Sequence, residues 1–463
     1  MRPSNRTDGL ISSIKMRNKI SLLYLATALL ALLLGMIFGI LSGLQYVMPE
    51  FIKAILPFNS LRPFHVTSVI AWIILCAVGG IYYYLSNSEA PRLYSDRLSK
   101  IHYFLFLGIG LTIYYSYYTG NFGGKEYLEF PPYLILPILF GWLLFGINYY
   151  KTMVGKVRNW PVYYWMWGTG ILFMIYHLSE AYLWLHPDIK NNFIKSLAIQ
   201  WKAGGSFVGS WNMLVYGTAI YLMAKIKGDD SIGRKRRSFF FYFLGLTNLM
   251  FGWAHHIYIV PTAPWVRYVA YGISMTEWII LFYMIYEWRK SLPEETKIKN
   301  WLPYKLLVMA DVWVFLNLIL ALLFSIPAIN FFTHGTHITV AHSMGTTIGI
   351  NTTILLASVL FIVNQIQPDF NLSSVKKGFR IFNVSLLLFW LSLLVAGVKR
   401  SHWMYFTKGI PFSEMQSQSH WIYIAFLLFG TGIFIGLLFI TLPVLKTLLT
   451  TYNLKGINEN ENQ

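Results

Sequence analysis

Long apolar stretches alternate with short polar ones from residue 20 to residue 447. Most are close to the roughly 20 residues that a helix needs to cross a bilayer. The two-residue alternation that is typical of half-buried strands is missing. The pattern therefore predicts an all-α integral membrane protein with a bundle of about twelve transmembrane helices. We expect these helices at 20–42, 65–86, 101–119, 131–150, 161–184, 206–226, 236–260, 265–288, 302–325, 337–365, 378–400 and 418–447.

The chain is predicted to form one transmembrane domain over residues 20–447. A basic N-terminus at 1–19 and a polar tail at 448–463 flank this domain, and both are expected in the cytoplasm. The first apolar run is too long for the core of a signal peptide, so we interpret it as a retained span. Cys76 is the single cysteine, which excludes a disulfide within the chain.

Composition agrees with a membrane protein, because 56% of the residues are hydrophobic and 12% are charged. The formal net charge of +18 is unevenly distributed. With loops assigned alternately to two sides, 27 of the 37 Lys and Arg lie on the side of the N-terminus and 10 on the other. Basic loops stay in the cytoplasm. This bias predicts cytoplasmic termini in a bacterial-type inner membrane, with membrane lipid and no nucleic acid as partner.

Histidines concentrate where the span 337–365 begins. His334, His337 and His342 lie within nine residues, and Met344 follows. Histidine inside hydrocarbon is costly and rare, so this cluster predicts a functional site. His342 and Met344 are two apart, which places them roughly 200° apart around a helix. That geometry suits two ligands for two planar cofactors on opposite sides of one helix.

Other polar residues mark the ends of neighbouring spans. His255 and His256 end the span 236–260, where adjacent imidazoles favour a metal or a cofactor over a structural role. Glu277 is an intramembrane carboxylate that requires a partner or a proton. Gly205 and Gly209 form a small-xxx-small face, which by itself indicates close helix packing.

Near the outer face, several residues have alternative interpretations. His65 is expected to open the second span, either as a ligand or as a histidine bonded to water. Arg62 suits a buried carboxylate or is a plain loop cation. Glu126 and Glu129 are three residues apart and would share a face if this segment were helical. They suit a calcium ion or a proton entry, or they belong to a solvated turn. The spacing of His177 and Glu180 predicts a buried pair, for proton transfer or for structure.

Together these motifs resemble the catalytic subunit (subunit I) of the haem–copper oxidase superfamily. The match is best to the large subunit of nitric oxide reductases and to cbb-type cytochrome oxidases. It extends over nearly the whole chain, in the order expected for that family. Its most specific parts are Lys125-Glu126-Tyr127-Leu128-Glu129, the stretch from His255 to Glu277, and Thr333-His334-Gly335-Thr336 with Ala341-His342.

The resemblance implies two b-type haems, one low-spin and one high-spin, with the high-spin haem facing a non-haem iron or copper. His65 matches a low-spin haem ligand, and Arg62 matches a residue that pairs with haem propionates. His342 matches the axial ligand of the high-spin haem. His255 and His256 match ligands of the non-haem metal, so His342, His255, His256 and Glu277 form the implied catalytic group. Glu126 matches a calcium ligand, and Glu129 and Glu277 match proton-path carboxylates.

The sequence departs from the family at three positions. Met344 stands where the family has the second low-spin histidine, and methionine is also an accepted haem ligand. Gly205 stands where a third metal-binding histidine is expected, and Gly209 where the reductases have a metal-binding glutamate. Neither glycine can coordinate a metal.

The resemblance implies an oxidoreductase that receives electrons from a cytochrome c-type subunit or a quinol. Electrons pass from the low-spin haem to the high-spin centre, which reduces a small gas. Nitric oxide, giving nitrous oxide, is favoured over dioxygen, because the sixth span lacks the histidine of the oxidases' His–Tyr link. The alternative is a divergent haem protein that relays electrons or binds or senses a gas without a complete second metal site.

Overall fold

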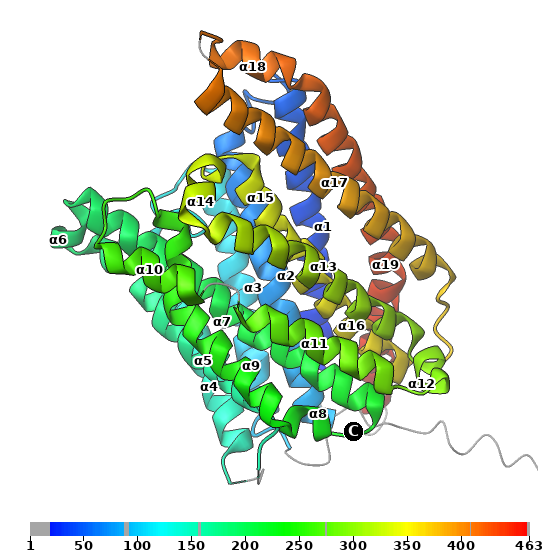
Figure 1. Cartoon of the computed structure of the whole chain (residues 1–463). Helices are drawn as coiled ribbons and strands as arrows, with labels where there is room; N and C mark the ends of the chain where they lie inside the picture. Colours follow the sequence, from blue (N-terminus) through cyan, green and yellow to red (C-terminus); the bar gives the residue numbers. More distant parts are fainter. Residues whose placement is uncertain (1–18, 88–91, 156–158, 274–275, 408, 461–463) are drawn as a thin grey trace, which may run out of the picture.

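The computed structural model describes residues 19–87, 92–155, 159–273, 276–407 and 409–460, without the side chains of 276–278 and 454–460 (Figure 1). All regular elements in these ranges are helical, apart from one isolated bridge between Lys125 and Leu128, which confirms the predicted fold class. The elements are α1 (Ile20–Val47), α2 (Phe58–Asn87), α3 (Asp96–Tyr118), η1 (Pro132–Leu134), α4 (Ile135–Met153), α5 (Val162–Glu180), η2 (Leu183–Leu185), α6 (Pro187–Lys190), α7 (Phe193–Lys227), α8 (Ser231–Arg234), α9 (Arg236–Phe251), η3 (Gly252–Ile257), α10 (Pro264–Ile273), α11 (Thr276–Ser291), α12 (Glu294–Lys299), α13 (Trp301–Ser325), α14 (Pro327–Thr333), α15 (His337–Met344), η4 (Gly345–Thr352), α16 (Thr353–Ile366), α17 (Ser373–Phe406), α18 (Phe412–Gln418) and α19 (His420–Asn460).

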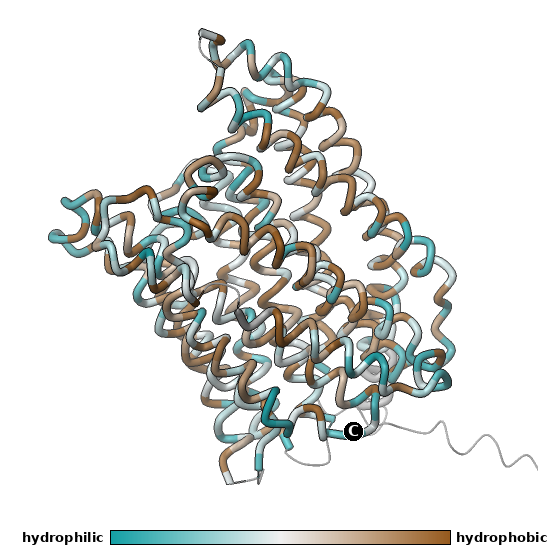
Figure 2. Tube along the Cα trace, viewed as in Figure 1, coloured by the Kyte–Doolittle hydropathy of each residue, from teal (hydrophilic) through white to brown (hydrophobic). Residues whose placement is uncertain are grey.

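Hydrophobic residues dominate along the long helices, and hydrophilic ones gather at their ends and on α6 and α12 (Figure 2). In the described chain, seven segments are long and apolar enough to cross a membrane. The other predicted ranges carry α3, α5, α7, α9 and α11, which are shorter or less apolar, so the count of about twelve stays a prediction. The seven segments are Ile20–Val47, Phe58–Asn87, Pro132–Met153, Trp301–Ser325, His337–Ile366, Ser373–Phe406 and His420–Asn453.

Short helices mark the two ends of the bundle. The connecting helices α14 and α18 lie in the upper part of Figure 1 and α6 at its left edge, whereas α8 and α12 lie at the lower end. The loops that the sequence assigns to one side of the membrane therefore lie apart from those assigned to the other. This arrangement is the one expected when successive long helices run in opposite directions.

Three predicted helical ranges differ from the observed helices. Helix α2 begins at Phe58, because the Pro57 carbonyl accepts hydrogen bonds from two following backbone amides, so His65 lies two turns inside the helix. The range 236–260 changes from α-helix to a 3₁₀ turn at Gly252. The range 337–365 contains a π-helical segment, η4, and such segments are frequent at functional sites.

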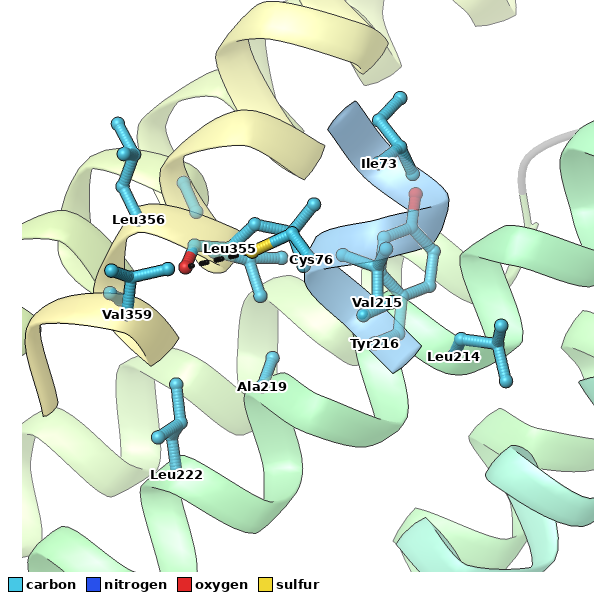
Figure 3. Close-up of a cluster of buried hydrophobic side chains, with 14 of the residues drawn as sticks. Ile73, Cys76, Leu214, Val215, Tyr216, Ala219, Leu222, Leu355, Leu356 and Val359 are labelled. Atoms are coloured by element: carbon cyan, nitrogen blue, oxygen red, sulfur yellow. Dashed lines mark hydrogen bonds between the residues drawn. The ribbon is translucent and has the colours of Figure 1, made fainter. Parts of the chain in front are cut away.

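Helices α2, α7 and α16 meet in a cluster of buried hydrophobic side chains around Cys76 (Figure 3). The thiol is buried, and its Sγ lies 3.9 Å from the Leu355 carbonyl oxygen. This confirms that the cysteine lies in an apolar span. Its neighbours in Figure 3 are aliphatic or aromatic and include Ile73, Leu214, Val215, Tyr216, Ala219, Leu222, Leu356 and Val359.

Candidate functional site

The predicted ligands meet around one cavity of about 670 Å³. Its walls come from helices that are far apart in the sequence, including α1, α2, α7, α15 and α19. Of the predicted site residues, those lining it are Arg62, His65, Glu126, His255, His256, His342 and Met344. His334 and His337 line it as well. The structure thus brings together histidines from three separate parts of the sequence, at residue 65, at 255–256 and at 334–342.

His65 reaches the cavity from α2. Its Nδ1 lies 2.7 Å from the Gly35 carbonyl oxygen of α1, a contact that orients the ring. Gly39, one turn further along α1, faces the same ring, and a Cβ built there would lie 2.9 Å from Nδ1. The absence of a side chain at Gly39 therefore lets α1 pass close to the imidazole. Orientation of a ligand ring by a backbone carbonyl is typical of metal-binding histidines.

His342 and Met344 lie on α15, directly before the π-helical segment. The His342 carbonyl accepts a hydrogen bond of 3.2 Å from Thr346 Oγ1. Thr346 Oγ1 in turn accepts one of 2.7 Å from Asn317 Nδ2 on α13. Both His342 and Met344 line the cavity, so the expected pair of ligands is present at its wall.

His255 and His256 lie side by side on η3, with ring centroids 4.1 Å apart. The His256 ring stacks on Trp201 of α7 at 5.0 Å with an interplanar angle of 9°. The His255 ring is perpendicular to that of His342, with centroids 6.4 Å apart. The two predicted halves of the reactive site are therefore adjacent.

The glycines of α7 face η3 and α9 at close range. A Cβ built on Gly205 would lie 2.6 Å from Trp253 Cβ, and one on Gly209 would lie 2.8 Å from Leu249 Cγ. Carbon atoms normally stay about 3.5–4 Å apart. This confirms the interpretation of the two glycines as a close-packing face, since no larger side chain fits there without a shift.

Arg62 pairs with both loop carboxylates at one part of the cavity. It forms an ion pair with Glu126, and its Nη1 lies 3.1 Å from Glu129 Oε1. The segment from Glu126 to Glu129 is not a helix, so the shared helical face considered from the sequence is absent. A positive φ of 70° at Tyr127 and the bridge from Lys125 to Leu128 turn both carboxylates toward Arg62.

The Glu129 side chain is largely buried, with 14% of its surface exposed. Burial raises the pKa of its carboxyl, while backbone hydrogen bonds and the Arg62 charge oppose the rise. Its Oε2 accepts no hydrogen bond within the described chain. The Glu129 carboxyl can therefore keep its proton at a pH at which an ordinary glutamic acid has lost it.

The predicted pair of His177 and Glu180 is present, with Nδ1 and Oε2 2.8 Å apart. Lys202 of α7 joins it through an ion pair of 2.6 Å with Glu180. This cluster does not line the cavity. The side chain of Glu277 lies outside the described residues.

Sequence reasoning missed two aromatic residues of the site. Trp201 stacks on His256, and the Phe324 ring lies 4.7 Å from that of His342 and 5.5 Å from that of His255. Both are ordinary residues of apolar helices, so no sequence signal separates them from the many other aromatics of the chain.

The donors suit haem. Imidazole and thioether groups are accepted haem ligands, and they reach one cavity from α2, α15 and η3. Arg62 adds a cation at the wall that would suit a propionate. A non-haem metal fits poorly, because within the described chain no three His, Cys, Asp or Glu side chains are grouped to hold an ion. Protein metal sites generally use at least three protein ligands.

Comparison with known proteins shows the family of this chain. Residues 19–433 match the family described as cytochrome c and quinol oxidase polypeptide I. A nitric oxide reductase subunit of Stutzerimonas stutzeri is 23% identical over 405 residues, which cover 81% of this chain and 82% of that protein. A cytochrome c oxidase subunit 1 homolog of Agrobacterium tumefaciens (strain T37) is 20% identical over 384 residues, covering 79% and 71% of the two chains.

Cytochrome c oxidase subunit 1 of Rhodobacter capsulatus is 19% identical over 406 residues, covering 83% of this chain and 74% of its own. A solved haem–copper terminal oxidase dimer superposes with a TM-score of 0.68 at 14% identity, over 93% of this chain and 84% of that one. The fold and the family match agree. The chain belongs to the cytochrome c and quinol oxidase polypeptide I family, and is thus a membrane oxidoreductase subunit of the haem–copper oxidase superfamily.

Proposed function

We propose that this chain is the catalytic subunit of a membrane enzyme that reduces nitric oxide to nitrous oxide. The observation that supports this most is the meeting of His65, Met344, His342 and His255 at one cavity. The similarity to a nitric oxide reductase subunit over 81% of the chain adds to it. Dioxygen is the less favoured substrate, since Gly205 stands where the oxidases carry the histidine of their His–Tyr link.

Two b-type haems belong to this proposal. His65 and Met344 would hold the low-spin haem, and His342 would hold the reactive one. When bound, the haems supply one-electron transfer and an iron that takes up a gas. Arg62 would neutralise a propionate, and its ion pairs with Glu126 and Glu129 hold the guanidinium at the cavity wall.

Proton supply is proposed to start at the outer carboxylates. Glu129 is buried and retains an oxygen that accepts no hydrogen bond in the described chain, so it can take up and release a proton beside Arg62. Glu277 is proposed as a further carboxylate of the path on the basis of the family resemblance. Calcium at Glu126 is part of the same proposal, and it would compete with Arg62 for this carboxylate.

The electron donor is proposed to be a cytochrome c-type subunit or a quinol, because the chain has no CxxCH motif for covalent haem attachment. The protein is proposed to lie in a bacterial-type cytoplasmic membrane with both termini in the cytoplasm. This orientation is supported by the excess of Lys and Arg in the loops on the side of the N-terminus.

A second function is favoured by one observation. Within the described chain, no three metal-ligating side chains are grouped to hold an ion, so the second metal centre of the family has no complete ligand set. A protein that binds haem and gas, and that relays electrons without turning nitric oxide over, would need no such centre.

Quantification of haem and metals beside a nitric oxide consumption assay tests both functions. We expect two b-type haems per purified chain and electron-dependent loss of nitric oxide. Two haems without consumption would favour the second function. A chain that binds no haem would contradict both.

A further inference from the structure

A second, smaller cavity adjoins the main one at the loop that carries Glu126. Its volume of about 20 Å³ is enough for one water molecule, which needs at least roughly 10–15 Å³. The residues that line both cavities are Glu126, Tyr127, Gly204 and Phe207. The two cavities therefore share a wall, and Tyr182 lines the smaller one alone.

Lys125 holds the loop in place at this second cavity. Its Nζ donates a hydrogen bond of 3.2 Å to Ser196 Oγ on α7, and it lies 5.2 Å from the centroid of the Trp184 ring on η2. Lys125 and Trp184 both line the second cavity. The loop, α7 and η2 are thus joined by specific contacts around a space of the size of one water.

Two buried polar atoms in this region have no hydrogen-bond partner among the described residues. They are Glu129 Oε2 and the hydroxyl oxygen of Tyr182. The Glu129 carboxylate and the Tyr182 hydroxyl are electrostatic neighbours, and Arg62 pairs with the other Glu129 oxygen at 3.1 Å. Buried polar groups are rarely left unsatisfied, and a bound water commonly joins two that do not bond directly. The two atoms therefore indicate a water site between them.

The other ionisable neighbours of Glu129 are already engaged or lie elsewhere. They are Arg62, Glu126, Tyr117 and Tyr127. Arg62 pairs with both carboxylates, and the Tyr117 hydroxyl lies 3.0 Å from Thr67 Oγ1. Among these described neighbours, Tyr182 is the one that lines the second cavity with a buried hydroxyl lacking a partner.

We propose that a water molecule bound between the Tyr182 hydroxyl and Glu129 Oε2 delivers protons from the second cavity to Glu129. The inference rests on the proposed function, in which Glu129 takes up protons for the reaction. In each transfer the water gives one proton to the Glu129 carboxylate and receives one from the solvent side. The water and Tyr182 are therefore unchanged after the transfer. Tyr182 is a positioning residue, because its hydroxyl holds the water in place.

Infrared spectroscopy of the purified full-length chain tests this site without turnover. The difference spectrum between two pH values contains the band of the protonated Glu129 carboxyl, which is identified by its loss in Glu129→Gln. In the unmodified protein, this band should have the frequency of a hydrogen-bonded carboxyl. Tyr182→Phe removes only the hydroxyl. It should move the band toward the frequency of a free carboxyl and slow its exchange in heavy water several-fold.

Tyr133→Phe is the matched control. It removes the same hydroxyl from a side chain of η1 that is 61% exposed. It should change neither the frequency of the Glu129 band nor its rate of exchange. Nitric oxide consumption should likewise fall in Tyr182→Phe and remain unchanged in Tyr133→Phe.

The possible failures are distinguishable. A free-carboxyl frequency in the unmodified protein would overturn the water site, and this measurement needs no variant. An unchanged band and exchange rate in Tyr182→Phe would overturn it as well, and undiminished nitric oxide consumption in that variant would overturn the role in proton delivery. An unmodified chain that shows the infrared effects but consumes no nitric oxide would contradict the proposed function and support the water site.

Discussion

Replacing Gly205 with alanine should destabilise the protein by pushing η3 away from α7. The new Cβ would lie 2.6 Å from Trp253 Cβ, about 1 Å closer than carbon atoms normally approach. Both atoms are attached directly to the main chain, so the two segments must separate. Overpacking of this kind costs about 1–3 kcal/mol.

Alanine also has a higher helix propensity than glycine, worth about 1 kcal/mol, which opposes the effect. A matched control removes this contribution. Gly108 of α3 has no atom within 4 Å of its built Cβ and does not line the cavity. The difference in unfolding free energy between Gly205→Ala and Gly108→Ala should therefore be about 1–3 kcal/mol.

Thermal unfolding of both variants in the same detergent, followed by tryptophan fluorescence, measures this difference. We expect Gly205→Ala to unfold several degrees below Gly108→Ala. We also expect its haem spectrum to change, because Trp253 and His255 share one 3₁₀ turn. Equal unfolding temperatures and unchanged spectra would refute the close contact between α7 and η3.

Three further changes test other parts of the site. Met344→His should lower the midpoint potential of the low-spin haem in a redox titration, because His/Met ligation raises it; an unchanged potential would exclude Met344 as a ligand. Asn330→Ala should reduce stability by about 1–3 kcal/mol in thermal unfolding, since the His255 and Phe324 carbonyls lose the hydrogen bonds that Asn330 Nδ2 donates; no loss would contradict a stabilising role of these two hydrogen bonds. Burial raises the pKa of Glu129 in the folded state, so its contribution to stability is present at low pH and falls as the pH rises through the folded pKa. Glu129→Gln should remove that fall, and parallel pH profiles of the two proteins would argue against the raised pKa.

Much of the fold could be predicted because apolar length in a membrane protein is a direct physical requirement. A helix must span the hydrocarbon with its backbone hydrogen bonds satisfied, so apolar runs such as 20–42 and 302–325 can be recognised from the sequence as membrane spans. Helix ends were less predictable. The second span was expected to begin at His65, but α2 begins at Phe58 and continues through Pro63.

Several residues that line the cavity were also predictable, since histidine inside an apolar span is costly and rare. His65, His255, His342 and Met344 were expected from the sequence and all line the cavity. Their partners were not. Arg62 was expected to meet a propionate, and it also pairs with Glu126 and Glu129 through a turn that sequence patterns do not specify.

The sequence by itself determined which residues carry chemistry and in which order the spans present them. The tertiary structure decided how far apart these residues lie. Whether Gly205 means a lost ligand or a closed contact depends on how near Trp253 comes, and the position of His255 beside His342 depends on Asn330 and Phe324. Such distances result from the packing of segments remote in sequence, and only the assembled bundle sets them.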